Sequence, residues 1–276
     1  MTEPDSVERS EPILPGPTEA MAALFNLPRP TDEVLGFGWQ WAYLLDRPAT
    51  ADLGRDGHPA RNVVPAPPGP GRRRMWAGGR MRMVTGLRVG DAAIRRTRIE
   101  SSIDKTGRTG RLTIVTVKHD YLANGEVALE EWQDLVYRDE SRTALPPAAA
   151  DPLERFDDDW EVATSSTLLF RFSALTYNGH RIHYDRDYAK TVEGYPGLVV
   201  HGPIQALLMA QHARHRIGVP RPGDEFEYRL VSPVFDDEGL VIQALPDDVV
   251  GDGELPLRVC TPTGRVTARG CYSRAV

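Results

Sequence analysis

The stretch that decides the fold runs from Arg171 to Leu208 and reads RFSALTYNGHRIHYDRDYAKTVEGYPGLVVHGPIQALL. It holds an Asn-x-x-x-x-His pair, Asn178 and His183, and then His201-Gly202-Pro203 at the start of an apolar segment. A histidine ring, which titrates near neutrality, beside a side-chain amide and a helix N-terminus indicates a catalytic site. Five of the seven histidines lie within this stretch or just after it: His180, His183, His201, His212 and His215.

The apolar segment predicts a buried helix. Pro203 suits the first helical position, and Gly218 with Pro220 marks an end, so we expect a helix from Pro203 to about Ile217. Between Ile204 and Ala210 only Gln205 is polar. A helix that is apolar nearly all round is buried on most of its faces.

Strands with apolar residues at alternate positions follow this helix. Gly-containing turns separate four such segments, at 226–235, 239–246, 255–262 and 265–273. One buried helix followed by an antiparallel meander predicts a sheet wrapped around the helix. The fold class is therefore α+β, with the helices on one face of the sheet.

The first half repeats this plan less completely. Its four predicted strands are 80–89, 93–103, 112–122 and 127–138. Thr18 is a candidate cap for a short helix over 19–27, and the Trp-rich segment 36–45 fits either a strand or a buried helical turn. Two such units that share a continuous sheet form a double hotdog, in which the first repeat is degenerate.

Composition shifts predict the organisation of the chain. Residues 1–16 are acidic and Pro-rich and are expected to form a mobile tail, and 53–74 are expected to form a long loop. Residues 144–152 read as a linker between an N-terminal degenerate hotdog, 17–143, and a C-terminal catalytic hotdog, 153–276.

Overall composition excludes several classes of function. The net charge of −6 argues against a nucleic-acid binder, which needs a basic surface to replace the counterions around phosphates. We find neither a secretory signal nor the roughly 18–20 apolar residues needed to span a bilayer, and therefore expect a cytoplasmic protein with no membrane partner. Cys260 and Cys271 are expected to be buried thiols rather than a disulfide.

The quoted stretch resembles the hydratase motif of the MaoC-like, (R)-hydratase branch of the hotdog superfamily. That motif runs Ser-Gly-Asp-x-Asn-Pro-Leu-His, followed by His-Gly at the start of the central helix. Asn178 stands where most of that branch has aspartate. The chain is more similar to the group that contains the hydroxyacyl-thioester dehydratases type 2 and the mesaconyl-C4-CoA (3-methylfumaryl-CoA) hydratases. The resemblance extends from about residue 18 to the C-terminus and includes LGRDGHP, RRRMWAGGRMR and EEWQDLVYR.

The resemblance implies an enoyl-CoA hydratase with three catalytic positions. His183 matches the catalytic histidine and is expected to act as the general base. Asn178 cannot take a proton but can hold water by hydrogen bonds. Gly202 would present its N–H to the thioester oxygen at a helix N-terminus, where the helix dipole favours negative charge.

The other expected contacts are with substrate. Arg72, Arg73 and Arg74 are candidates for the phosphates of coenzyme A, although a solvated loop explains them equally well. Arg181 and Tyr184 are candidates for a second carboxylate on the substrate, and His201 either binds substrate or simply packs before the helix. No cofactor is expected beyond the coenzyme A of the acyl-CoA substrate. The resemblance leaves pairing into a homodimer open.

Alternative functions stay open at this point. The two His-x-x-His pairs suggest zinc, but no Cys or carboxylate at ligand spacing completes either pair, so we predict no metal. Within the same enzyme class, a 3-hydroxyacyl-thioester dehydratase of the fatty-acid type is the main alternative. A thioesterase would need a carboxylate at the helix start, where Gly202-Pro203-Ile204-Gln205 has none. A non-catalytic acyl-CoA binder or dehydratase partner subunit is another alternative, and its main support is Asn178 in place of the usual aspartate.

Overall fold

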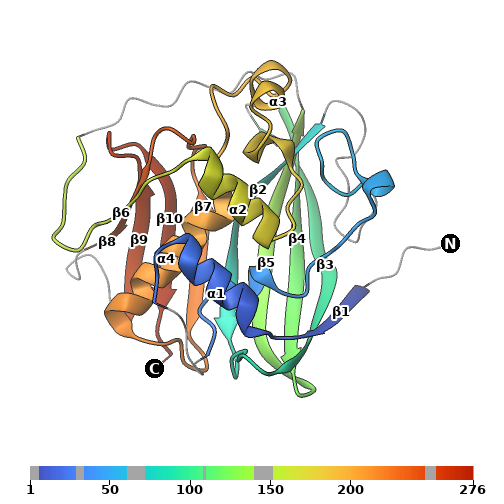
Figure 1. The fold of residues 1–276 in the computed structure, drawn as a ribbon, viewed down its shortest axis with the longest axis vertical. Coiled ribbons are helices and arrows are strands. Elements are labelled where there is room, and N and C mark those ends of the chain that lie inside the picture. Colours follow the sequence, from blue (N-terminus) through green and yellow to red (C-terminus); the bar gives the residue numbers. More distant parts are fainter. Residues whose placement is uncertain are drawn as a thin grey trace.

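One antiparallel sheet of ten strands organises the whole chain (Figure 1), in the order β1-β3-β4-β5-β2-β7-β10-β9-β8-β6. The two halves meet where β2 pairs with β7, so the sheet is continuous, as predicted. The α+β double hotdog is thus confirmed. The computed structural model describes residues 6–28, 34–60, 72–107, 110–139, 152–245 and 253–275.

The N-terminal half supplies the five strands at one end of the sheet: β1 (Ser6–Pro12), β2 (Arg72–Met83), β3 (Ala92–Gly107), β4 (Gly110–Ala123) and β5 (Glu126–Asp139). Asn124 and Gly125 both have positive φ, at 53° and 86°, which suits the tight β4–β5 hairpin. The predicted tail was wrong for residues 6–16, because β1 pairs with β3 along its whole length. The predicted loop 53–74 was also too long, because β2 begins at Arg72.

The same half contributes one helix, α1 (Pro15–Leu24), and two 3-10 turns, η1 (Trp39–Ala42) and η2 (Thr50–Asp52). Thr18 is not the helix cap that we expected, since the helix starts three residues earlier with Leu14 at the cap position. The Thr18 hydroxyl instead contacts the Tyr43 hydroxyl, and the Thr18 backbone N–H donates to the same oxygen at 3.1 Å. This contact ties α1 to the segment that follows η1.

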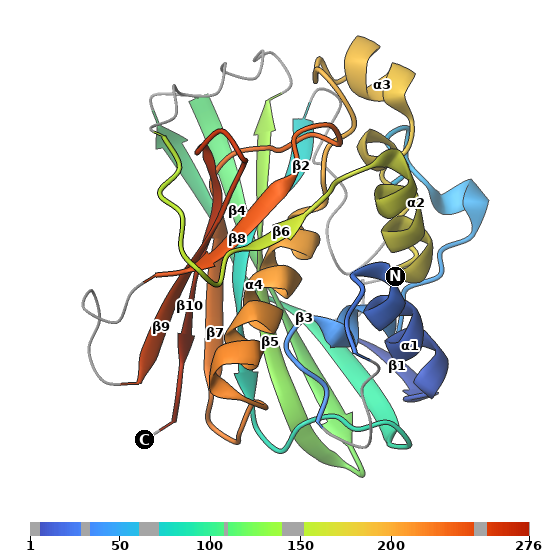
Figure 2. The ribbon, with the colours of Figure 1, turned by 60° about the vertical axis from the view of Figure 1, so that its left-hand side comes forward.

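The C-terminal half carries β6 (Trp160–Val162), β7 (Glu225–Leu230), β8 (Leu240–Ala244), β9 (Glu254–Cys260) and β10 (Val266–Ser273). Its helical elements are α2 (Ser166–Leu175), η3 (Arg181–His183), α3 (Arg186–Thr191) and α4 (Gly202–Ile217). Figure 2 shows α4 packed along β7 to β10, with α1 and α2 beyond it. Ten residues of α4 are buried and Gly218 ends it with φ of 87°, so the predicted buried helix is confirmed.

The described residues bear on two smaller expectations, and a third lies mostly outside them. Within them, no helix is both long enough and apolar enough to cross a membrane. Both cysteines are free, as expected, although Cys271 is only partly buried. Most of the predicted linker 144–152 lies outside the described residues.

Candidate active site

Asn178 is fixed by the way α2 ends. Ser165 caps the start of this helix by accepting the Leu168 N–H at 3.1 Å. At the other end Tyr177 takes a left-handed conformation, φ 53°, and the Asn178 N–H returns to the Ser173 carbonyl at 2.8 Å. This is a Schellman ending with tyrosine where glycine is usual. It places Asn178 at the rim of the cavity described below.

The side-chain oxygen of Asn178 is hydrogen-bonded within its own loop. Its Oδ1 accepts the backbone N–H of His180 at 2.9 Å, which also fixes the orientation of the amide. The Nδ2 amino group, a donor, is therefore left for a ligand, while Oδ1 keeps only one of its two lone pairs.

His183 is buried, with 7% of its surface exposed, and is fixed by one strong contact. Its Nδ1 lies 2.6 Å from the Val199 carbonyl oxygen, while Val199 N–H donates to the Ile182 carbonyl at 3.0 Å. A carbonyl only accepts, so Nδ1 carries the proton and Nε2 is left as a bare acceptor. Burial lowers the pKa of His183 to about 4, partly offset by the Val199 hydrogen bond, so the ring is neutral at physiological pH.

Gly202 is the first residue of α4, where the N–H groups have no partner within the helix. A Cβ at this position would lie 2.1 Å from Cδ1 of Leu230 on β7. A side chain at this position would therefore have to displace the end of the Leu230 side chain. The N-terminus of α4 therefore faces the cavity with a free donor and the positive end of the helix dipole.

His201 packs before the helix, the second of the two roles that we considered. It is fully buried, its ring stacks on His183 with centroids 3.6 Å apart, and its Nε2 lies 2.9 Å from Ser173 Oγ. Burial, together with His183, lowers its pKa well below the usual value. Neutral His201 thus supports the ring of His183 from behind.

A loop from the N-terminal half joins the site, and the sequence reading missed it. The His58 ring lies against His180 with centroids 4.0 Å apart, and His180 meets His183 edge-on at 5.3 Å. Asp56 Oδ2 lies 2.9 Å from His58 Nδ1. The signal was the Asp-Gly-His within LGRDGHP, a segment that supports the family resemblance without indicating a role in chemistry.

In this Asp–His pair Asp56 is ionised and His58 is neutral. Burial and the charge of Arg74 lower the pKa of His58 to about 4, against the opposing influence of Asp56, so the ring is neutral. Burial acts to raise the pKa of Asp56, but the hydrogen bonds and charge of His58 outweigh it and bring the value to about 2. Burial also takes the pKa of His180 well below its usual range.

The predicted arginines divide into two groups. Arg73 is engaged by the protein, with Nε 2.9 Å from Glu193 Oε2 and an N–H donated to the Glu193 carbonyl at 2.9 Å, so it is not open to a phosphate. Arg181 pairs with Asp185 at 2.8 Å and lies over the Tyr188 ring. Arg74 lines the same cavity as Arg73 but lies beside Asp56 and hydrogen-bonds Tyr137. The Arg72 side chain lies outside the described residues.

Tyr184 lines the cavity, but its hydroxyl is hydrogen-bonded within the protein. It is 47% exposed, and its hydroxyl donates to the Gly179 carbonyl at 3.0 Å. Asp185, which follows it, caps α3 by accepting the Tyr188 N–H at 3.0 Å. Arg181 and Tyr184, the two candidates for a substrate carboxylate, are thus both hydrogen-bonded to protein groups. His212 of α4 is buried, and its Nε2 lies 3.5 Å from Asp158 Oδ2.

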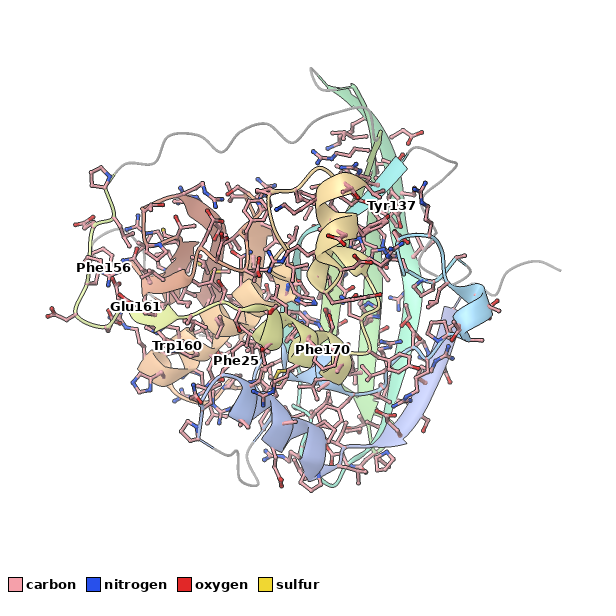
Figure 3. The ribbon with its side chains drawn as sticks, turned by 45° about the horizontal axis from the view of Figure 1, so that its top comes forward. Phe25, Tyr137, Phe156, Trp160, Glu161 and Phe170 are labelled. Carbon is pink, nitrogen blue, oxygen red and sulfur yellow. The ribbon has the colours of Figure 1, made fainter. Side chains whose placement is uncertain are left out.

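A continuous cavity of about 2020 Å³ is lined by residues of both halves, among them His58, Arg74 and His180. Figure 3 labels Phe170 on α2, which lines the cavity, and Tyr137 on β5, the partner of Arg74. The walls of the cavity also include Asn178, His183 and Gly202. The three positions predicted to carry the chemistry therefore open onto one space large enough for a thioester and part of its carrier.

Three metal-ligand side chains at the cavity lie close enough to one another to hold a cation. Ligand atoms of Asp56, His58 and His180 lie within 4.8 Å of one another. The fold thus supplies the carboxylate that sequence spacing lacked. However, His58 Nδ1 and Asp56 Oδ2 already satisfy each other. The absence of a metal stays a prediction.

Fold and site together define a hydratase or dehydratase of the double-hotdog type, a carbon–oxygen lyase. The chain matches the family "Hydroxyacyl-thioester dehydratase type 2" over residues 38–236 and belongs to it. It is 42% identical over 224 residues to the mesaconyl-C(4)-CoA hydratase of Chloroflexus aurantiacus, covering 79% of each chain. It is 30% identical to the mitochondrial hydroxyacyl-thioester dehydratase type 2 of Schizosaccharomyces pombe, over 44% of this chain and 41% of that one.

Solved structures support the fold. HtdX of Mycobacterium tuberculosis superposes with a TM-score of 0.66 at 18% identity, covering 98% of this chain and all of that one. A MaoC-like dehydratase from Phytophthora capsici gives 0.65 at 15% identity, covering 98% and 95%. A further M. tuberculosis protein, described as having a double hotdog fold, gives 0.53 at 14% identity, covering 99% and 96%.

Proposed function

We propose that this protein adds water reversibly across the double bond of mesaconyl-C4-CoA to give citramalyl-CoA. The observation that carries the proposal is the bare Nε2 of His183, held ready by the Val199 carbonyl beside Asn178 and Gly202. The similarity to the Chloroflexus hydratase supports the choice of substrate. Coenzyme A enters only as part of that substrate.

His183 activates the water. In the hydration direction its neutral Nε2 accepts a proton from water as the oxygen bonds to the β-carbon, an effect worth roughly 10²–10⁴ in rate. The Nδ2 amino group of Asn178 donates a hydrogen bond to that oxygen and orients it. His201, stacked on His183, keeps the ring in place.

The start of α4 stabilises the charge that develops. As water adds, electrons move onto the thioester carbonyl oxygen and form an enolate. The Gly202 N–H and the dipole of the 16-residue helix favour this negative charge. The helix start carries no carboxylate to attack the thioester itself, which disfavours thioesterase chemistry.

Arg74 is the residue that we propose for the free carboxylate of mesaconyl-C4-CoA. That carboxylate is attached to the β-carbon, the atom that receives the hydroxyl, so its partner must lie close to the histidines. Arg74 does, beside Asp56 and within the electrostatic reach of both His58 and His180. A guanidinium matches a carboxylate with paired hydrogen bonds.

A panel of thioesters tests the function. Purified protein receives mesaconyl-C4-CoA, crotonyl-CoA or a longer 2-enoyl-CoA, and the loss of enoyl-thioester absorbance is followed together with release of free thiol. We expect the highest kcat/KM with mesaconyl-C4-CoA and no thiol release. A preference for the longer chain would instead identify a fatty-acid-type dehydratase, and tight binding without turnover would identify an acyl-CoA binder.

The role of Arg74 is tested by Arg74→Met. We expect kcat/KM for mesaconyl-C4-CoA to fall by about 10²-fold, because a charge-assisted pair contributes roughly 1.5–3 kcal/mol, while crotonyl-CoA, which has no second carboxylate, changes little. Arg80→Met, at an arginine on the same strand that stacks on Trp132, is the matched control. Equal losses with both substrates would refute selective carboxylate binding.

A further inference from the structure

The segment 54–58 is built onto the active-site loop through direct backbone contact. Gly57 has φ of 87°, and a Cβ there would lie 1.9 Å from the Gly179 carbonyl oxygen. A Cβ on Gly179 would in turn lie 2.8 Å from the Gly57 oxygen. The Arg181 N–H donates to the Asp56 carbonyl at 2.9 Å. Two glycines and this hydrogen bond therefore hold 54–58 against the loop between Asn178 and His183.

This contact delivers one titratable pair to the cavity. Asp56 holds His58 twice, with Oδ1 accepting the His58 backbone N–H at 3.0 Å and Oδ2 accepting the ring Nδ1–H at 2.9 Å. His58 Nε2 is thereby left as a bare acceptor, and His58 lines the same cavity as His183. The arrangement matches the general design of a histidine base oriented by a carboxylate.

The hydration reaction requires a second proton transfer that Asn178 cannot perform. Water loses a proton while the β-carbon gains oxygen, and the neighbouring α-carbon must gain a proton. An amide neither takes up nor releases protons at physiological pH. Of the buried rings at this site, His58 is the one that donates to a carboxylate, so an imidazolium there is stabilised by a full negative charge.

We infer that His58, held by Asp56, is the second proton-transfer residue of this site and handles the proton of the α-carbon. In hydration the proton leaving water passes from His183 to His58 across the cavity that both line, and His58 donates it to the α-carbon as the enolate collapses. One O–H bond of water and the π bond of the C=C break, one C–O and one C–H bond form, and both histidines return to neutral. In dehydration His58 removes the α-proton. This inference rests on the proposed function.

Exchange of the α-hydrogens isolates this step from water addition. The saturated thioester methylsuccinyl-C4-CoA has no β-hydroxyl to lose, so in D₂O the enzyme can only exchange its α-hydrogens, followed by proton NMR. We expect His58→Gln, which retains the backbone hydrogen bond to Asp56 Oδ1, to slow exchange by at least about 10²-fold. Asp56→Asn should slow it by at least about 10-fold, and His183→Gln should leave it within about 10-fold of wild type.

Controls separate this role from a purely structural one. His215→Gln makes the same change at an exposed histidine of α4 and should exchange and hydrate at the wild-type rate. Unchanged circular dichroism of His58→Gln would show that the fold is intact. Wild-type exchange or hydration rates in His58→Gln overturn the inference, as does the absence of exchange by the wild-type enzyme. Loss of activity on chelation that zinc restores also overturns it, in favour of a metal site at Asp56, His58 and His180.

The same measurements keep this inference apart from the proposed function. A wild-type protein that hydrates none of the three enoyl thioesters refutes the proposed function. A wild-type protein that hydrates mesaconyl-C4-CoA, combined with a fully active His58→Gln, refutes the role of His58 alone.

Discussion

The two halves of the sheet cover their inner faces in opposite ways. In the C-terminal half α4 lies on β7 to β10 and buries an almost wholly apolar surface. In the N-terminal half the residues around η1 fill the corresponding position beside β2 and β5. There the fully buried Glu131 accepts hydrogen bonds from four side chains: Gln40, Trp41, Tyr121 and Gln133.

This difference separates two tasks. A long apolar helix gives the C-terminal half a rigid N-terminus on which to place an oxyanion donor. Among the described residues of the N-terminal half no long helix fills the space beside the sheet, and part of the cavity lies there. This half also contributes the loop with Asp56 and His58. A buried polar network holds it together, and such a network is stable only while every member keeps its partner.

The largest effect is expected at His183 in the C-terminal half. His183→Gln removes the general base while keeping a polar group near the Val199 carbonyl. We predict that the maximal hydration rate falls by at least about 10²-fold, and by up to about 10⁴-fold. Steady-state hydration of mesaconyl-C4-CoA measures the loss, with His215→Gln as the matched control. A variant that hydrates at the wild-type rate would remove His183 from the mechanism.

Glu131 in the N-terminal half should matter for stability. Glu131→Leu leaves buried donors on Trp41, Gln40 and Tyr121 without an acceptor, and we predict a loss of about 3 kcal/mol in unfolding free energy. Urea denaturation measures this loss. Glu131→Gln keeps the size and one acceptor and should lose less. Equal stability of Glu131→Leu and wild type would show that the polar network is dispensable.

Acid should destabilise the active-site region before it affects the rest. The pKa values of His58 and His183 are lowered to about 4 in the folded protein, against 6.5 when unfolded. Between these values the unfolded chain binds more protons, so the unfolding free energy decreases as pH falls from about 6.5 to about 4, by up to ~3 kcal/mol per ring. Denaturation across this range tests it, and His183→Gln should reduce the slope. An unchanged slope would contradict burial of a neutral His183.

The smallest effect is expected at the end of α2. Tyr177 is 55% exposed and has φ of 53°, which is unfavourable for a residue with a side chain. Tyr177→Gly should therefore raise the unfolding free energy by about 1 kcal/mol, measured by thermal or urea denaturation. A loss of stability would mean that the Tyr177 side chain contributes more than its backbone costs.

The sequence predicted the C-terminal half well because its signals are local. Pro203 and Gly218 bracket α4, the strands after it alternate in burial, and Asn178 and His183 lie five residues apart on one short loop. Strand β1 was not predicted because its polar, charged sequence SVERSEP has no core-facing pattern. It pairs only at the sheet edge, where the main chain supplies the bonding.

The residues that the N-terminal half contributes to the site could not be predicted from the sequence, because their contacts join positions far apart in the chain. His58 and His180 are 122 positions apart, and nothing near either residue indicates that Gly57 and Gly179 pack together. Arg73 and Arg74 are adjacent, yet β2 directs one to Glu193 and the other beside Asp56. The two arginines have different partners because neighbouring side chains on a strand point to opposite faces, and this cannot be assigned before the position of the strand is known.

The central claim is that this cavity adds water to the double bond and leaves the thioester intact. Incubation of the wild-type protein with mesaconyl-C4-CoA in ¹⁸O-labelled water, followed by mass spectrometry, tests it directly. We predict one ¹⁸O atom in the acyl group of an intact coenzyme A thioester, and no free thiol. Label in a released free acid together with free coenzyme A, or no label at all, would contradict the account.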